Sequence, residues 1–342
     1  MSNRQSITRS QLRELIGELP RVDLAHKPTP LEECPRLSEA LGGPRILIKR
    51  DDCTGLAFGG NKARQLEFTL GEAVAQGADL IIHGAASQSN HCRQAAAAAA
   101  KLGLSTVLVL ARDAKSALVQ GNLLLDYILG AKVRLVEASA PGSELNEIKK
   151  EVAEEYRAQG YNPFVIAPPT STTLGAVAYA DCLLETCDQL DEQGVSADYL
   201  VISSAGATQS GLVLANKATG AGLKIVGIAP IRWPYDTATA MADTANRVAE
   251  LLGLELTVEP EEVYNTDAYV GEAYGIVTRE GVEALRLMAR TEGIILDPSY
   301  TAKALAGLME LVQRGEIESD ATVVFLHTGG TPALFAYAEE LV

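Results

Sequence analysis

Short apolar runs alternate with longer amphipathic segments along most of the chain. The apolar runs predict buried strands at 46–48, 80–82, 106–110, 133–136, 164–167, 199–203, 225–228 and 323–326. The longer segments space their apolar residues as helices do, at 62–76, 90–102, 120–129, 143–159, 173–190, 210–219, 237–252, 279–292 and 300–314. Strands that alternate with helices of this length indicate βαβ units, so we expect an α/β fold with mostly parallel sheets.

The first of these helices is preceded by a Gly-Gly-Asn-Lys turn at 59–62. Glycines can adopt backbone angles that are closed to other residues, and Asn61 is a favourable N-cap residue. Lys62 falls on the same helical face as Leu66 and Leu70, so we expect its amine to point inward. A partly desolvated lysine loses some of its preference for the charged form, and a neutral amine is a nucleophile toward carbonyls. The alternative interpretation is a surface lysine.

Three polar loops follow predicted strands, and open α/β sheets bind ligands beyond the carboxyl ends of their strands. The loop 84–91 has a Ser/Asn cluster that suits either a helix cap or a carboxylate. The loop 204–211 offers small residues and backbone amides at a helix start, which suits a phosphate. It has neither the Walker A nor the dinucleotide glycine pattern, which disfavours a nucleotide. The third loop, 327–332, contains two further glycines.

An inward lysine, a carboxylate-type loop and a phosphate-type loop at one edge of the sheets have a single economical explanation. Pyridoxal 5'-phosphate needs an amine for its aldehyde, a cradle for its phosphate and a neighbour for its ring nitrogen. The sequence therefore predicts this cofactor and an enzyme. The competing class is a non-catalytic ligand-binding α/β protein, which would stay colourless when the cofactor is added.

Composition narrows the class of protein and its partners. A chain of 342 residues suits two domains, and its net charge of −15 disfavours nucleic acid and anionic membranes as partners. No apolar run is long enough to cross a bilayer, and the polar stretch 1–18 has no signal-peptide core, so we expect a cytoplasmic protein. The five cysteines lack metal-ligand spacing, which indicates reduced thiols and no metal site.

Five separated motifs resemble those of one enzyme family. They are Lys-Arg-Asp-Asp at 49–52, the turn at 59–62, Gln-Ser-Asn-His at 88–91, Leu-Asp-Pro-Ser-Tyr at 296–300 and His-Thr-Gly-Gly at 327–330. In collinear order they strongly resemble the aminocyclopropane-carboxylate (ACC) deaminase/D-cysteine desulfhydrase family of pyridoxal-phosphate enzymes, which includes cysteate sulfo-lyase-like members. The resemblance covers nearly the whole chain from about residue 21.

The resemblance implies an architecture. We expect the tryptophan-synthase-β-like fold, fold type II, with two open parallel-sheet α/β domains and the cofactor in the cleft between them. Residues 1–54 plus 165–342 would form the large domain, and residues 55–164 would form a smaller inserted domain. The resemblance also implies a homodimer.

The resemblance gives roles to individual residues. Lys62 would carry the cofactor and move protons, Asn90 would contact the cofactor's ring hydroxyl, and Ser89 would hold the substrate carboxylate or assist proton transfer. Tyr274 and Tyr300 would be active-site tyrosines. The other cofactor-binding candidates lie in the phosphate loop or around the ring, at Asn61, Ala205, Gly206, Ala207, Thr208, Thr301 and Thr328. The other substrate-binding candidates are Gln88, Thr172 and Arg232.

Two locally unusual stretches bear on the substrate. The Thr/Ser run at 170–173 offers several hydroxyls, and Arg232 lies beside Trp233, the only tryptophan. Hydroxyls and an arginine would suit an anionic β-substituent such as a sulfonate. The alternative interpretation is an ordinary helix start and a surface loop with a packed tryptophan.

The residue after Tyr300 bears on the reaction. The cyclopropane-cleaving deaminases have a glutamate there, whereas this chain has Thr301. A carboxylate would favour a protonated ring nitrogen, and a hydroxyl from Thr301 or Thr328 leaves the ring more nearly neutral. This weaker electron sink is sufficient for α,β-elimination, so we expect D-cysteine or cysteate to give pyruvate, ammonia and sulfide or sulfite. ACC deaminase and amino-acid racemase are the alternatives.

Overall fold

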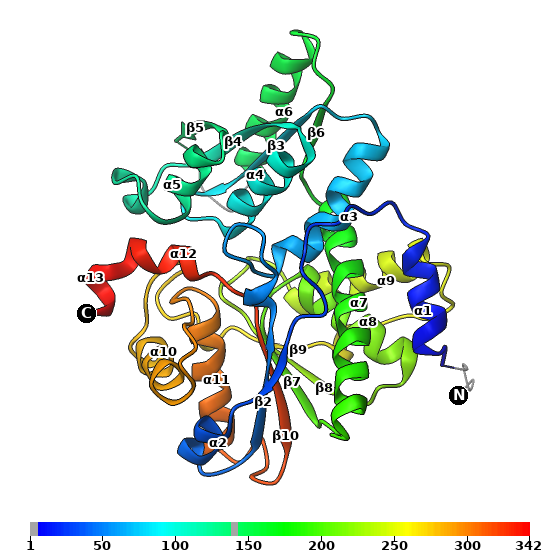
Figure 1. Ribbon diagram of the computed structural model, residues 1–342, viewed down its shortest axis with the longest axis vertical. Helices are drawn as coiled ribbons and strands as arrows, with labels where there is room; N and C mark the ends of the chain where they lie inside the picture. The colour runs from blue at the N-terminus through cyan, green and yellow to red at the C-terminus, as the bar shows by residue number, and fades with distance from the viewer. Residues whose placement is uncertain (1–5, 138–142) are drawn as a thin grey trace.

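The computed structural model describes residues 6–137 and 143–342. Residues 1–5, which begin the polar stretch 1–18, lie outside the described residues, as do residues 138–142. The described strands form two sheets, one above the other in Figure 1, with the helix α3 (Lys62–Ala75) between them. In this part of the chain no helix is long and apolar enough to cross a membrane.

The large sheet has six strands in the order β1-β2-β10-β7-β8-β9. Only β1 is antiparallel to its neighbour, and the other pairs are parallel. In sheet order the strands are β1 (Leu31–Glu33), β2 (Arg45–Arg50), β10 (Thr322–His327), β7 (Tyr199–Ser203), β8 (Lys224–Ile228) and β9 (Tyr264–Thr266).

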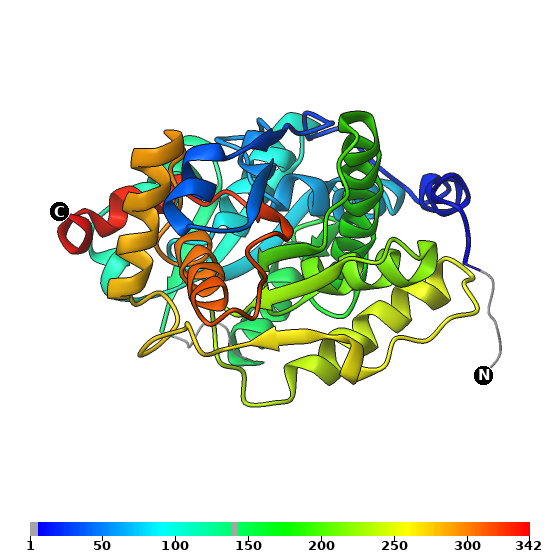
Figure 2. The same cartoon turned by 90° about the horizontal axis from the view of Figure 1, so that it is seen from below.

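Helices cover both faces of the large sheet, and Figure 2 shows the two layers on either side of it. Alternating strand residues enter separate cores, so that Leu47 faces one layer while Ile46 and Ile48 face the other. The first layer comprises α1 (Arg9–Gly17), α7 (Thr170–Gln193), α8 (Ala207–Thr219) and α9 (Thr237–Leu251). The second comprises α2 (Pro35–Leu41), α10 (Arg279–Glu292) and α11 (Thr301–Gln313).

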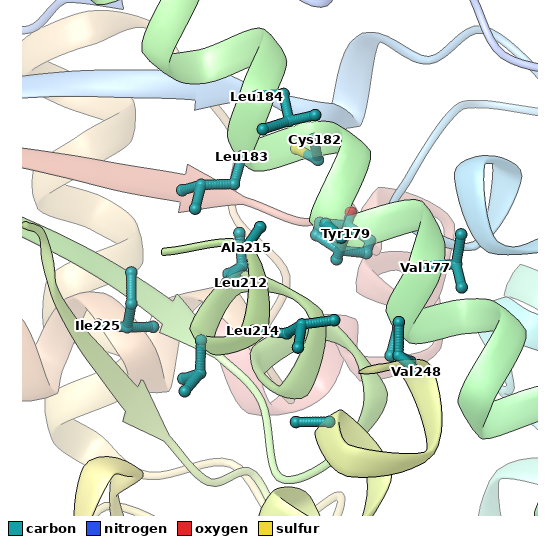
Figure 3. Close-up of a cluster of buried hydrophobic side chains, with 14 of the residues drawn as sticks. Val177, Tyr179, Cys182, Leu183, Leu184, Leu212, Leu214, Ala215, Ile225 and Val248 are labelled. Atoms are coloured by element: carbon teal, nitrogen blue, oxygen red, sulfur yellow. The ribbon is translucent and has the colours of Figure 1, made fainter. Parts of the chain in front are cut away.

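The first layer forms a close-packed core, part of which is drawn in Figure 3. There Leu183 of α7, Leu212 and Leu214 of α8, and Val248 of α9 meet with no exposed surface. Burying a leucine side chain stabilises a fold by about 2 kcal/mol relative to leaving it exposed. This core therefore fixes the position of α8, whose N-terminus carries the predicted phosphate loop.

The small sheet has four parallel strands in the order β5-β4-β3-β6. They are β5 (Lys132–Val136), β4 (Ser105–Ala111), β3 (Leu80–Ala86) and β6 (Pro163–Val165). The helices α4 (Asn90–Leu102) and α5 (Gly121–Ile128) pack on one face, and α6 (Ser143–Arg157) packs on the other. The chain enters this sheet after β2 and returns to the large sheet at β7, as the inserted-domain prediction requires, although the domain boundaries stay a prediction.

The chain ends in a short helical segment made of α12 (Thr331–Leu334), η4 (Phe335–Tyr337) and α13 (Ala338–Leu341). Figure 1 shows it in red at the level where the two sheets meet. It reaches the small-sheet side, since Lys115 pairs with Glu340 and lies over the ring of Tyr337 at 4.3 Å. The remaining 3-10 turns are η1 (Asp51–Cys53), η2 (Ala114–Ala117) and η3 (Pro260–Glu262).

The predicted α/β class and parallel sheets are confirmed, and the differences are local. The sequence prediction did not include α1, α2, β1 or β9, which are short or lie at the edges of the fold. α7 begins at Thr170 rather than at Thr173, because the chain turns into the helix directly after Pro169. α8 begins at Ala207 rather than at Ser210, so the predicted phosphate loop is partly helical.

Two glycine turns pack directly on each other where the sheets meet. A Cβ atom at Gly329 would lie 2.7 Å from the Cα of Gly60, and a Cβ at Gly60 would lie 3.2 Å from the carbonyl oxygen of Thr328. Both glycines also have positive φ, +125° at Gly60 and +89° at Gly329. Only glycine at both positions allows this approach.

We expect Gly329→Ala to destabilise the fold by about 3 kcal/mol, because it adds backbone strain and a steric clash with Gly60. Gly315→Ala is the matched control. Gly315 has a φ of +69° but would have nothing within 4 Å of a new Cβ, so its substitution adds strain alone, about 1 kcal/mol. Urea unfolding followed by circular dichroism measures both variants, and equal losses would contradict the clash.

Candidate active site

The turn before α3 has four consecutive residues in the left-handed region of backbone space. Ala57, Phe58, Gly59 and Gly60 have φ values of 43°, 70°, 67° and 125°. Residues with a side chain are strained there, so the turn depends on support from its neighbours. Thr54 gives this support, because its hydroxyl accepts from the amide of Gly60 at 2.8 Å and donates to the carbonyl of Gly60 at 2.9 Å.

Groups from both sheets hold the same turn. The guanidinium of Arg93 in α4 donates to the carbonyl of Gly59 at 2.9 Å, and the side-chain amide of Gln94 donates to the same oxygen. From the large sheet, the carbonyl of Thr328 accepts from the amide of Asn61 at 3.0 Å. The turn therefore lies where α3, α4 and the loop after β10 meet.

Lys62 begins α3 and is linked to the predicted phosphate loop. Its amine donates to Gln65 Oε1 at 3.1 Å, and Gln65 Nε2 donates to the hydroxyl of Thr208 at 3.0 Å. Asn61 Nδ2 also lies 3.4 Å from this hydroxyl. Asn61 occupies the N-cap position with helical backbone angles and caps no backbone amide, so its expected capping role is wrong.

The amine of Lys62 is desolvated. As a whole residue Lys62 is partly exposed, but burial of the amine lowers its pKa from the usual 10.5 to about 8. At neutral pH a larger share of this lysine is neutral than of a lysine in water, and the neutral amine is the nucleophilic form. This agrees with the inward lysine that the sequence predicts.

Backbone amides at the start of α8 are available for an anion. The amides of Gly206 and Gln209 donate to the hydroxyl of Ser204 at 3.3 and 3.2 Å. Ala207 and Thr208 are the first two helical residues, and the amides at such positions have no acceptor within the helix. Together with the positive end of the helix dipole, these two amides form a suitable cradle for a phosphate.

The loop before α4 is bonded to α4 and to α5. Ser89 caps α4, since its hydroxyl accepts from the amide of Cys92 at 3.1 Å. Gln88 Nε2 donates to the carbonyl of Gln120 at 3.1 Å, and Gln88 Oε1 accepts from the amide of Asn122 at 2.9 Å. The Ser89 hydroxyl keeps its proton for a ligand, whereas both ends of the Gln88 side chain are occupied. Their substrate-binding roles stay predictions.

Tyr274 and Tyr300 meet as the family resemblance implies. Their hydroxyls are hydrogen-bonded to each other, and their ring centroids lie 6.0 Å apart at 68°. Burial raises the pKa of Tyr274 to about 12 and raises that of Tyr300 well above its usual 10. Both phenols therefore stay protonated at neutral pH.

The two threonines predicted beside the cofactor's ring nitrogen have different surroundings. The hydroxyl of Thr301 is buried and donates to the carboxylate of Asp297 at 2.8 Å, and it accepts from the Asp297 amide at 2.9 Å. Thr328 is also buried, but within the described residues its hydroxyl makes no hydrogen bond. Both roles stay predictions, and Thr328 has the freer hydroxyl.

The two other substrate candidates make contacts with backbone carbonyls. The hydroxyl of Thr172 donates to the carbonyl of Pro169 at 2.7 Å. Arg232 donates to the carbonyl of Gly271 at 2.8 Å and lies 3.5 Å from the carboxylate of Asp267. These bonds tie Arg232 to the segment that precedes Tyr274, and its role toward an anionic substituent stays a prediction.

The donors that remain free match the cofactor that the sequence predicts. Lys62 offers an amine of lowered pKa, and Ala207 and Thr208 offer two amides. Asn90 is partly exposed and uses its Oδ1 to accept from Asn122, so its NH2 group remains. An amine for an aldehyde, amides for a phosphate and an NH2 group for a ring oxygen are the groups that pyridoxal phosphate requires.

Comparison with known proteins agrees with this geometry. The model of the pyridoxal-phosphate dependent enzyme family matches residues 22–329. This chain belongs to that family. It is 38% identical to the D-cysteine desulfhydrase of Klebsiella pneumoniae subsp. pneumoniae over 331 residues, which are 95% of this chain and 98% of the relative. The predicted family and cofactor are thereby confirmed.

Two solved structures are similar to this chain over nearly its full length. The crystal structure of an ACC deaminase homologue is 36% identical, with a TM-score of 0.87 over 97% of this chain and 98% of that one. Apo diaminopropionate ammonia lyase from Escherichia coli is 17% identical, with a TM-score of 0.69 over 99% and 93%, which shows the fold alone. The predicted fold type II is confirmed.

Four residues that support this candidate site were not among the predicted site residues: Thr54, Gln65, Arg93 and Asn122. Gln65 could have been found, because it lies one helical turn from Lys62 on the same face. Asn122 follows a glycine at a predicted helix start, which is a weaker signal. Thr54 and Arg93 act on the carbonyls and amides of the 59–60 turn, and no local pattern in the sequence reveals such contacts.

We expect Lys62 of the cofactor-free enzyme to react with a small aldehyde and borohydride with a midpoint near pH 8. Labelling rises with pH because the neutral amine, which reacts, dominates above its lowered pKa of about 8. Peptide mass spectrometry measures the labelled fraction, and Lys62→Arg identifies the peptide as a control. A midpoint at the usual value of 10.5 would contradict the desolvated environment.

Proposed function

We propose that this chain is a pyridoxal-phosphate-dependent carbon–sulfur lyase that acts on D-cysteine. The reaction is an α,β-elimination in which D-cysteine and water give pyruvate, ammonia and hydrogen sulfide. The observation that carries the proposal is the desolvated amine of Lys62, linked through Gln65 to the anion-binding start of α8. The full-length likeness to a D-cysteine desulfhydrase supports the choice of substrate.

The residues divide into a base and proton donors. The bound cofactor supplies an aldehyde that takes up amines and a ring that withdraws electrons from the substrate's α-carbon. Lys62 serves as the base, since its lowered pKa of about 8 makes a larger share of the amine neutral near neutral pH than in a lysine in water. Tyr274 and Tyr300 keep their protons, so this pair is suited to protonate the departing sulfur. Ser89 is suited to hold the substrate carboxylate at the start of α4.

Burial lowers the pKa of the base and raises the pKa of the proton donors. Opposite pKa shifts of this kind identify acid and base residues in active sites. Burial lowers the pKa of an amine and raises that of a phenol, since it disfavours the charged form of each. Near pH 8 the phenols are therefore neutral, and about half of the Lys62 amine is neutral. An elimination needs a base and an acid at the same pH, and this site provides them.

The alternatives differ in the bond that breaks. L-Cysteate would release sulfite, and the hydroxyls at 170–173 with Arg232 are the features that favour it. ACC would need ring opening, which Thr301 disfavours because no carboxylate follows Tyr300. A racemase would return the other stereoisomer without pyruvate. The bonds of Arg232 to the 267–271 segment favour the thiol substrate over the sulfonate.

We expect D-cysteine to give the highest kcat/KM in a panel of D- and L-cysteine, D- and L-cysteate, β-chloroalanine and ACC. Pyruvate, ammonia and sulfide are measured together, because elimination releases them in equal amounts. Lys62→Ala removes the base and the attachment point, so it should lower kcat by about 10³-fold or more. Sulfite release from cysteate at a higher kcat/KM than that for D-cysteine would overturn the choice of substrate.

We propose in addition that the chain is a cytoplasmic homodimer. The support is an apolar patch beside and on α5, where Leu118, Val119, Leu124, Tyr127 and Ile128 are between 42% and 68% exposed. Contiguous apolar surface of this kind is typical of protein–protein interfaces. The N-terminus of the same helix carries Asn122, which contacts the 88–90 loop.

We expect Ile128→Lys to shift the protein from dimer to monomer in light scattering after size-exclusion chromatography. A lysine in the centre of an apolar interface would be desolvated without a partner. Leu251→Lys is the matched control, because Leu251 is a similarly exposed leucine on α9 of the large-sheet part. A dimer that survives Ile128→Lys, or a wild-type monomer, would exclude this patch as the interface.

A further inference from the structure

Asn122 is fully buried at the start of α5, where it contacts the loop that carries Gln88 and Asn90. Its Nδ2 atom makes two hydrogen bonds, to the backbone carbonyl of Gln88 at 2.8 Å and to the side-chain Oδ1 of Asn90 at 2.9 Å. Its backbone amide makes a third, to Gln88 Oε1 at 2.9 Å. One residue thus holds two neighbouring positions of the candidate substrate loop.

The backbone carbonyl of Gln88 determines how the side-chain amides of Asn122 and Asn90 are oriented. A backbone carbonyl only accepts, so the end of Asn122 that faces the carbonyl of Gln88 must be its NH2 group. The second hydrogen of that group needs an acceptor, and the nearest atom, 2.9 Å away, belongs to Asn90. Asn90 must therefore present its oxygen to Asn122. The orientation of Asn90 follows from a fixed backbone group rather than from a free choice between two flipped states.

The glycine before Asn122 makes this contact possible. Gly121 has a φ of +56°, and a Cβ there would lie 2.4 Å from Gln88 Oε1 and 3.0 Å from the carbonyl of Pro332. Glycine therefore lets α5 begin close enough to the loop for the Asn122 amide and side chain to reach it. The carbonyl of Pro332 belongs to the C-terminal segment, so three parts of the chain converge at Gly121.

We propose that Asn122 is a positioning residue that turns the NH2 group of Asn90 toward the cofactor's ring oxygen. With its Oδ1 occupied, Asn90 has only Nδ2 to offer, and within the described residues that nitrogen has no other hydrogen-bond partner. The proposal rests on the proposed function, in which Asn90 contacts this oxygen. A donor at that place stabilises the negative charge of the ring oxygen, whereas a flipped Asn90 would direct its own oxygen there and oppose it.

The direction of the effect follows from the charge. A donor to the ring oxygen favours the deprotonated state of the bound cofactor, so it lowers the pH at which the cofactor's absorption band changes. Loss or reversal of the donor raises that pH by about one unit, the size expected for one hydrogen bond to a charged group. We expect cofactor affinity to fall about 10-fold as well, because one hydrogen bond to a charged group is lost.

The experiment titrates the absorption band of the holoenzyme with pH in Asn122→Asp and Asn122→Leu. The aspartate variant keeps the shape and removes the NH2 donor, and the leucine variant removes both polar groups. Asn216→Asp is the matched control. Asn216 also bonds a backbone carbonyl and amide, both of Leu223, but it lies on α8 and far along the chain from the 88–90 loop. Its substitution should lower the melting temperature without moving the titration.

The variants are repeated with Asn90→Ala, because a residue that acts through Asn90 has nothing left to position there. We expect the two Asn122 variants to raise the midpoint only when Asn90 is present. An unchanged midpoint in both variants, or an equal shift with and without Asn90, would overturn the positioning role. A wild-type protein that shows no cofactor band would instead overturn the proposed function, and this role with it.

Discussion

The contact between Gly60 and Gly329 sets the position of every group around Lys62. A side chain at either glycine would push the turn before α3 away from the loop after β10, since a Cβ at Gly329 would lie only 2.7 Å from the Cα of Gly60. This close approach lets the carbonyl of Thr328 accept from the amide of Asn61, so that the first residue of α3 is fixed relative to the large sheet. Because α4 holds the same turn through Arg93, the position of Lys62 is defined by both sheets at once. The position of Lys62 therefore does not depend on the packing of one loop alone.

Near α3, Arg64 and Lys49 are paired with carboxylates, whereas among the described residues no carboxylate pairs with the amine of Lys62. Arg64 lies two residues on and bonds the carboxylates of Asp51 at 3.0 Å and Glu185 at 2.7 Å. Burial would raise the pKa of Glu185, yet the bonds and charges of Arg64 and Lys49 lower it to about 2. This buried network connects β2, α3 and α7. Its two carboxylates, Asp51 and Glu185, both pair with Arg64. Lys62 is influenced by desolvation alone, and its pKa falls to about 8. Lys49, which is buried, and Lys62, whose amine is desolvated, thus have different surroundings because only Lys49 has a carboxylate partner among the described residues.

The sequence predicted those features that depend on periodicity or on a local turn. The alternating apolar runs predicted the mostly parallel α/β fold, and the glycines at 59–60 predicted the lysine turn, because both signals reside in neighbouring residues. The prediction was weaker where two distant segments meet. Asn61 looked like a helix cap, but its side chain turns to Thr208, 147 positions away. Arg232 was one candidate for an anion ligand, and its bond to the carbonyl of Gly271, which depends on how the segment before Tyr274 folds back, had no signal in the sequence. Such contacts follow from tertiary packing, which no single stretch of sequence encodes.

Lys303 and Arg232 both hold the segment that precedes Tyr274. Lys303 is buried, and its amine donates to the carbonyl of Val270 at 2.7 Å, while Arg232 donates to the carbonyl of the next residue, Gly271. Two cations on separate elements therefore hold adjacent carbonyls of one segment, and charge-assisted bonds of this kind are the stronger ones. Desolvation lowers the pKa of Lys303 to about 8, so part of this hold is lost as the pH rises through that value. The amine of Lys62 loses its proton over the same range, so one rise in pH makes more of Lys62 neutral and weakens the bond of Lys303 to the Val270 carbonyl.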